Sequence, residues 1–121
     1  MKFSPLLIFL ISISMSGCYY DNEEELYQSS TNCDTTQFAF STRVLPILNQ
    51  NCNGCHSGAS PSAGINLSTH ADVLVYAQNG SLLGSIEHAQ GYSAMPKSSP
   101  KIPECQLLSI KKWISTGSPN N

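Results

Sequence analysis

The sequence predicts an all-α fold of about three to five short helices, and two observations support this prediction. Apolar residues recur at helical spacing in several short segments between residues 38 and 118. No segment in that range shows the alternation of apolar and polar residues that is typical of a β-strand, and there is no internal repeat. The predicted domain is small, so its own side chains supply a limited hydrophobic core.

The first and last predicted helices have the clearest amphipathic patterns. The first spans residues 41–51, with Ser41 as its N-cap and Pro46 near its first turn, where proline is tolerated. Its apolar stripe consists of Val44, Leu45, Ile47 and Leu48. The last helix is expected to begin at Pro103 and to end at Gly117. The apolar residues on one of its sides are Leu107, Ile110, Trp113 and Ile114.

Two shorter helices are predicted in the middle of the domain. Thr69 and Asp72 have the spacing of a helix cap, which predicts a helix over residues 70–78 that ends before Gly80. A further apolar segment predicts a helix over residues 81–88. The remaining segments are rich in Gly, Ser and Pro and are expected to form loops at 57–64 and 90–102.

One pentapeptide, Cys52-Asn53-Gly54-Cys55-His56, carries most of the functional information. Two cysteines separated by two residues and followed directly by histidine form the attachment pattern of c-type haem. Cys52 and Cys55 can each form a thioether bond to one haem vinyl group, and His56 can then bind the iron. The alternatives for this pattern are a thioredoxin-like dithiol or half of a zinc site.

Residues 1–17 have the features of a secretory signal peptide. Lys2 supplies a positive charge, and residues 6–13 form an apolar run that is too short to cross a bilayer. The small residues before Cys18 resemble the lipobox of bacterial lipoproteins, in which that cysteine receives the lipid, although Met15 stands where leucine is commoner. An ordinary cleaved signal with Cys18 free or paired is the alternative. In both cases we expect an exported protein, located in the periplasm or attached to the outer membrane as a lipoprotein.

Segments of different composition flank the predicted domain at residues 38–118. Residues 18–37 are polar and acidic, lack any sustained period and are expected to form a linker, and residues 119–121 form a short tail. The whole chain has six Lys and Arg residues against eight Asp and Glu residues. Because no basic patch is evident, this composition argues against binding of nucleic acid.

Each of the five cysteines has a predicted role. With Cys18 assigned to lipid and Cys52 and Cys55 to haem, Cys33 and Cys105 remain. In an oxidising compartment these two are expected to form a disulfide, and two separate free thiols are the alternative. A metal site built from four cysteines is not favoured, because Cys33 and Cys105 have no neighbouring ligand at metal-binding spacing.

Met95 is the predicted second axial ligand of the haem iron. Signal cleavage would remove the other two methionines of the chain. Met95 precedes Pro96 in a polar loop and not on an amphipathic face, where a methionine that fills the core would be expected. His88 and His70 are rival candidates for this ligand, and an open sixth position is the third possibility.

The order of these features resembles a class I cytochrome c. The Cys52-Asn53-Gly54-Cys55-His56 motif, the Met95-Pro96 loop and a terminal aromatic helix follow one another within residues 38–118, and the likeness is closest to small lipoprotein-anchored cytochrome c domains. The supporting runs are Val44-Leu45-Pro46-Ile47-Leu48, Gly64-Ile65-Asn66-Leu67 and Lys112-Trp113-Ile114. The resemblance implies that the first and last helices cross, with contacts that involve Phe40, Val44 and Trp113.

The resemblance also implies a function. A single haem c held by Cys52 and Cys55, with iron bound by His56 and Met95, would transfer one electron at a time without acting on a substrate, so the protein is not expected to be an enzyme. The expected partners are redox proteins of the cell envelope, with the membrane reached through a lipid on Cys18. Two alternatives stay open. One is a haem protein with an open or displaceable sixth position, as in a small-ligand sensor or an accessory subunit of a redox enzyme, and the other is a haem-free thiol or metal module.

Overall fold

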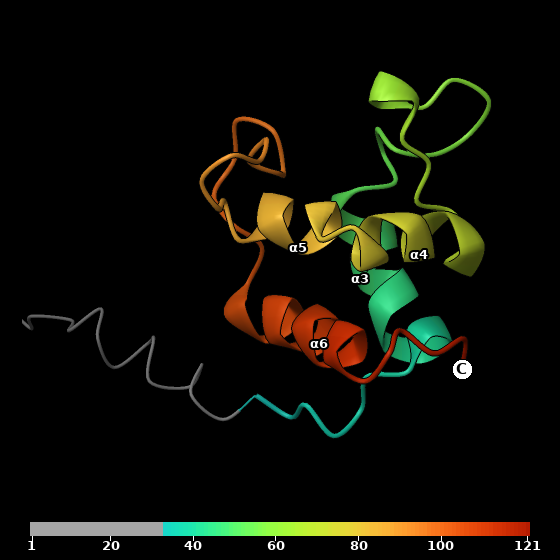
Figure 1. Cartoon of the computed structure of the whole chain (residues 1–121), viewed down its shortest axis with the longest axis vertical. Coiled ribbons are helices and arrows are strands. Elements are labelled where there is room, and N and C mark those ends of the chain that lie inside the picture. The colour runs from blue at the N-terminus through green and yellow to red at the C-terminus, as the bar shows by residue number, and fades with distance from the viewer. Residues whose placement is uncertain (1–32) are drawn as a thin grey trace, which may run out of the picture.

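The computed structural model describes residues 33–121, and this part of the chain consists of helices and loops without a β-strand (Figure 1). Its α-helices are α3 (Leu45–Asn51), α4 (His70–Gln78), α5 (Ser81–Ile86) and α6 (Glu104–Ser115). A π-helical turn, η2 (Phe40–Val44), leads directly into α3, and a 3-10 turn, η3 (Ser62–Gly64), lies in the following loop. The all-α prediction is therefore confirmed for this part. No helix within it is long and apolar enough to span a membrane. The predicted signal peptide, Cys18 and the linker up to residue 32 lie outside the described residues.

The helix predicted over residues 41–51 is present, but its start differs from the prediction. It begins as the π-helical turn at Phe40, and its N-cap is Ala39 and not Ser41. The backbone N–H groups of Phe40 and Ser41 donate to the side-chain and main-chain oxygens of Asn121, at 2.9 Å and 2.8 Å. Because Asn121 satisfies these terminal donors, the helix does not need a local side-chain cap at Ser41.

The predicted helix over residues 70–78 is confirmed as α4, with the expected cap. The backbone N–H of Asp72 donates to the Thr69 hydroxyl at 3.3 Å. The helix predicted over residues 81–88 is shorter than expected, because α5 ends at Ile86. His88 adopts a left-handed backbone conformation with φ of 54°, which is incompatible with a continuing α-helix.

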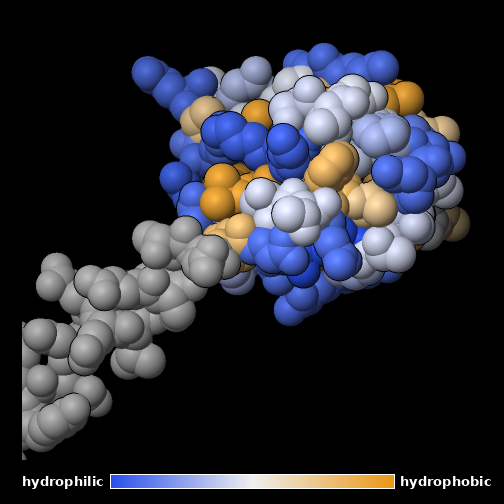
Figure 2. Space-filling model, turned by 90° about the horizontal axis from the view of Figure 1, so that it is seen from below, coloured by the Kyte–Doolittle hydropathy of each residue, from blue (hydrophilic) through white to orange (hydrophobic). Residues whose placement is uncertain are grey.

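The terminal helix α6 follows the prediction closely. Pro103 precedes it as the N-cap and is not the first helical residue, while Gly117 lies just beyond its end with φ of 92°. In Figure 1, α6 lies below α4 and α5. On the face drawn in Figure 2, apolar residues lie in small patches among hydrophilic ones, which is normal for the surface of a globular domain.

The core is centred on the contact between η2 and α6. The Phe40 ring lies 5.5 Å from the fully buried Trp113 ring, and the His70 ring packs edge-on against Phe40 at 4.8 Å. The indole N–H of Trp113 donates to the Pro119 carbonyl at 2.9 Å, so the buried polar atom is satisfied. The contact expected between Phe40 and Trp113 is present, and Val44 is buried beside it.

The predicted disulfide between Cys33 and Cys105 is present, with 5.2 Å between the two Cα atoms. It joins the segment before η2 to the first turn of α6 and closes a loop with a sequence separation of 72 residues. The Cys105 carbonyl also accepts a hydrogen bond from the buried Ser109 hydroxyl, which in turn accepts one from Arg43. The bridge and this chain of hydrogen bonds therefore fasten α6 to the start of the domain.

Replacement of Cys33 and Cys105 by serine is expected to lower the free energy of unfolding by as much as roughly 4 kcal/mol, because the unfolded chain then gains the entropy of an open loop. Denaturant unfolding followed by circular dichroism measures this difference. A single Cys33→Ser variant should lose the same stability as the double variant, since either change removes the bridge. An unfolding midpoint equal to that of the unmodified protein would contradict the stabilising role.

Candidate functional site

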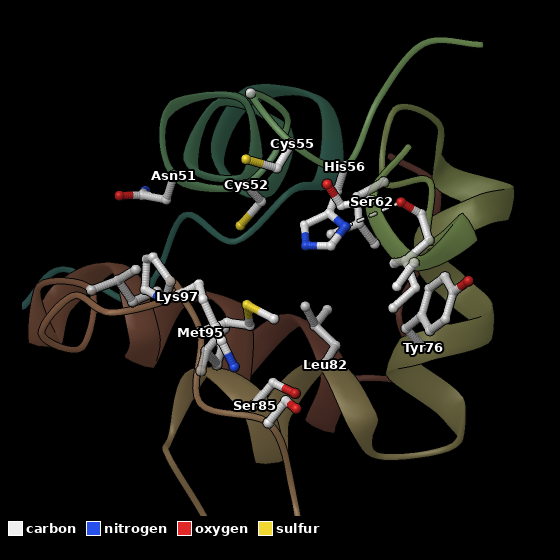
Figure 3. A pocket seen from close by; sticks show the side chains of 18 of the residues that line it. Asn51, Cys52, Cys55, His56, Ser62, Tyr76, Leu82, Ser85, Met95 and Lys97 are labelled. Carbon is white, nitrogen blue, oxygen red and sulfur yellow. Dashed lines mark hydrogen bonds between the residues drawn. The ribbon is translucent and has the colours of Figure 1, made fainter. Parts of the chain in front are cut away.

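A cavity of about 650 Å³ lies between the segment after α3, helices α4 and α5, and the loop before α6 (Figure 3). Its volume is in the range of about 300–1,000 Å³ that is usual for sites that bind small molecules and cofactors. Much of its wall is apolar and is formed by Ile65, Leu67, Tyr76, Leu82, Ile86 and Ile102. Such a cavity can enclose a large apolar ligand.

All four residues singled out from the sequence, Cys52, Cys55, His56 and Met95, line this cavity. Cys52 and His56 extend into it from the segment after α3, whereas the Met95 sulfur enters from the opposite side (Figure 3). Cys52 is half-buried and Cys55 is exposed. The fold thus brings two thiols, an imidazole and a thioether together around one space.

The imidazole of His56 is oriented by a backbone carbonyl. Its Nδ1 lies 3.2 Å from the Ile65 oxygen, and donation to that carbonyl requires the proton to be on Nδ1. The unprotonated Nε2 is then available as a ligand, and Figure 3 shows this side of the ring turned into the cavity. The Leu67 N–H also donates to the His56 carbonyl at 2.8 Å, which fixes the backbone of the same residue.

The end of α3 places the first thiol. Cys52 is the C-cap of α3, and its N–H donates to the Leu48 carbonyl at 2.8 Å. The Cys55 and His56 N–H groups both donate to the Cys52 carbonyl at 3.0 Å, which folds the pentapeptide into a tight turn. Burial raises the pKa of the Cys52 thiol to about 11. A redox-active dithiol needs at least one thiol whose pKa is lowered, and Cys52 does not supply it.

The raised pKa of Cys52 predicts unequal alkylation in haem-free protein that keeps its helices and its disulfide. The folded environment favours the neutral thiol, so the reactive thiolate of Cys52 stays scarce at neutral pH and increases about tenfold per pH unit up to about 11. Iodoacetamide at pH 8 should therefore modify the exposed Cys55 first. Peptide mass spectrometry after timed quenching measures the two rates, and equal rates at pH 8 would contradict the prediction.

The two rival histidines lie away from the cavity wall. The Nε2 of His88 is 3.0 Å from the Met95 carbonyl oxygen, and the Nε2 of His70 is 2.9 Å from the Ser118 carbonyl oxygen. His70 is also packed against the rings of Phe40 and Trp113. Each ring therefore has a structural partner, and His56 is the histidine that faces the cavity.

Sequence reasoning did not single out several residues that line the cavity. Tyr76, Leu82 and Ile86 lie on the two predicted middle helices, but helical spacing does not distinguish a core residue from one in a cavity wall. Ser85 and Lys97 also line the cavity without any signal in the sequence. Only the packing of α4, α5 and the Met95 loop against one another shows that these residues line a cavity.

A zinc site finds no support in the part of the chain that the structure describes. Among residues 33–121, no group of three or more His, Cys, Asp or Glu side chains is arranged to hold a metal ion. The comparisons with known proteins add no assignment, since no protein-family model, curated protein or solved structure matches the sequence significantly.

Proposed function

We propose that the protein is a mono-haem c-type cytochrome that transfers single electrons in the cell envelope. Cys52 and Cys55 would hold the haem through thioether bonds, and His56 and Met95 would bind its iron. The observation that carries this proposal is that the four side chains, predicted from the sequence motif and the Met95 loop, line one largely apolar cavity.

The residues present fit this group. The cavity has a volume suited to a cofactor, its thiols have the spacing of the attachment motif, and the His56 ring has its Nδ1 at the Ile65 carbonyl and its other side turned into the cavity (Figure 3). The Met95 thioether enters from the side opposite His56 (Figure 3). When bound, haem supplies a one-electron redox centre, and a methionine ligand raises its potential relative to a nitrogen ligand.

The chain has three tasks in this proposal. The Ile65 carbonyl keeps the His56 ring in one tautomer and one orientation. Apolar side chains such as Leu82 and Ile102 line the cavity and would shield a bound haem from water. Cys55, exposed at the surface, marks the edge at which a redox partner could approach through a small transient interface.

The proposed location in the envelope has support from two features. The disulfide between Cys33 and Cys105 is typical of oxidising compartments, and residues 1–17 have the pattern of an export signal. A lipid on Cys18 would tether the domain to the membrane through the acidic linker at residues 18–37. The contact between Phe40 in η2 and Trp113 in α6 is one that the resemblance to class I cytochromes c implies.

An optical redox titration of the haem-loaded protein tests this function. We expect a reversible one-electron transition and no binding of carbon monoxide to the reduced protein, because the Met95 thioether would already bind the iron. Carbon monoxide binding by the unmodified protein would favour a ligand sensor with a displaceable sixth position. A protein without visible absorbance would contradict both haem-based functions.

A further inference from the structure

The loop that carries Met95 folds back onto the end of α5. The last carbonyls of a helix have no partner within the helix, and here the returning loop supplies donors to them. The Ala89 N–H donates to the Gly84 carbonyl at 2.9 Å, and the N–H groups of His88 and Met95 donate to the Ser85 carbonyl at 3.2 Å and 3.0 Å. The backbone of Met95 is thus fastened directly to the helix that forms a wall of the cavity.

The other backbone group of Met95 is held by a side chain from the same turn. The Nε2–H of His88 donates to the Met95 carbonyl over 3.0 Å. The N–H of Met95 therefore bonds to the last turn of α5, and its carbonyl bonds to His88, two residues beyond the end of that helix. These two bonds restrict the position from which the thioether enters the cavity.

The backbone conformation of His88 gives an independent reason to assign a role to its side chain. Its φ of 54° lies in the left-handed region, where glycine is the least strained residue. A glycine would end α5 equally well, but it could not reach the Met95 carbonyl. The presence of an imidazole at this position is explained by the hydrogen bond that it makes.

Tyr92 provides a second contact between the loop and α5. Its ring lies against Gly84 so closely that a Cβ atom added there would come within 2.5 Å of the ring. A larger residue at this position would clash with the ring, so the contact requires glycine even though glycine is less favourable than alanine in a helix. The Met95 loop is consequently built against α5 at both Tyr92 and Met95.

From these contacts we infer that His88 is a positioning residue that holds Met95 in place to bind the haem iron and keeps the sixth position closed to small ligands. This inference rests on the proposed function, because it assigns His88 a role through Met95. His88 itself does not line the cavity. Its hydrogen bond holds the backbone of Met95 and so limits how often the Met95 thioether dissociates from the iron.

The test uses the full, haem-loaded protein with His88→Asn. Asparagine tolerates the left-handed conformation, but its side chain is too short to replace the imidazole at the Met95 carbonyl. Loss of one hydrogen bond typically corresponds to about tenfold in an equilibrium constant, so the fraction of molecules in which the thioether is away from the iron should rise about tenfold. The reduced variant should then bind carbon monoxide at concentrations at which the unmodified protein does not. The charge-transfer absorption from thioether to ferric iron should weaken in parallel, while covalent haem content stays unchanged.

His70→Asn is the matched control, because it removes a comparable bond from an imidazole to the Ser118 carbonyl outside the cavity. It should lower stability without changing carbon monoxide binding or the thioether absorption of the folded protein. Met95→Ala is the second reference, because it removes the proposed ligand itself.

The outcomes separate this inference from the proposed function. If Met95→Ala changes the thioether absorption and His88→Asn does not, the positioning role is wrong and methionine ligation stands. If Met95→Ala changes nothing, methionine ligation itself is wrong. If His88→Asn fails to fold, nuclear magnetic resonance of the unmodified reduced protein decides: an Nε2 proton of His88 protected from solvent exchange supports the role, and rapid exchange overturns it.

Discussion

Replacement of His56 by alanine is expected to abolish the accumulation of stable haem-loaded protein. His56 is the histidine that lines the cavity, and its ring is held for ligation by the Ile65 carbonyl. Without the imidazole, the iron would lack the ligand that we propose for it from the attachment motif. We expect covalent haem per molecule of chain to fall by at least about tenfold, because loss even of a group that only orients a metal ligand typically costs that much. Absorbance of the pyridine haemochrome relative to total protein measures this ratio.

The control for this experiment is His70→Ala, which removes a histidine that lies outside the cavity. Its haem content per folded molecule should equal that of the unmodified protein, even though the loss of the contact with Phe40 lowers stability. Normal haem content in the His56→Ala variant would contradict the assignment of residues 52–56 as a haem attachment motif.

Replacement of Met95 by alanine should leave haem covalently attached but change the reduction potential and the ligand binding of its iron. The thioether is lost, so the potential is expected to fall by on the order of 100 mV, within the roughly 0.8 V range that axial ligands span. The reduced variant should also bind carbon monoxide, because the sixth position is now open. Potentiometry and difference spectra with carbon monoxide measure the two effects.

Met95→Leu separates the ligand from the space that it fills. Leucine has a volume close to that of methionine but cannot bind iron, so it avoids much of the cavity left by alanine. The leucine variant should show the same fall in potential with a smaller loss of stability. If the potential of both variants equals that of the unmodified protein, Met95 is not a ligand.

Local sequence signals predicted the elements whose ends depend on neighbouring residues. The Thr69 hydroxyl caps α4 through Asp72, and Gly117 follows α6 in the expected left-handed conformation, because both signals act within one turn. The disulfide between Cys33 and Cys105 followed from a count of cysteines together with the expected compartment.

Features that depend on distant contacts were beyond reach of the sequence. Asn121 satisfies the first donors of η2 from the other end of the domain, which removed the need for Ser41 as a cap. The apolar residues of α5 had a helical pattern, but the pattern could not show that Leu82 faces a cavity. The bond from His88 to Met95 depends on a left-handed turn that no residue type in the sequence specifies.

Four residues of the candidate site were singled out from the sequence, but the cavity that they line was not predicted. Cys52, Cys55 and His56 are fixed by a motif whose spacing has a chemical reason, and Met95 stood out by its polar loop. The structure adds that these residues share one cavity and that the Ile65 carbonyl orients the imidazole. A backbone carbonyl has no residue-specific signal, so sequence reasoning could not identify this partner.

The most direct test of the central claim is a haem stain on a reducing, denaturing gel. The full chain is produced with its export signal in cells that attach c-type haem, beside a Cys52→Ser/Cys55→Ser variant. Thioether bonds survive reduction and denaturation, so we predict haem-dependent staining that migrates with the unmodified protein and is absent from the variant. Exported, disulfide-bonded protein that carries no stain would contradict the assignment as a c-type cytochrome.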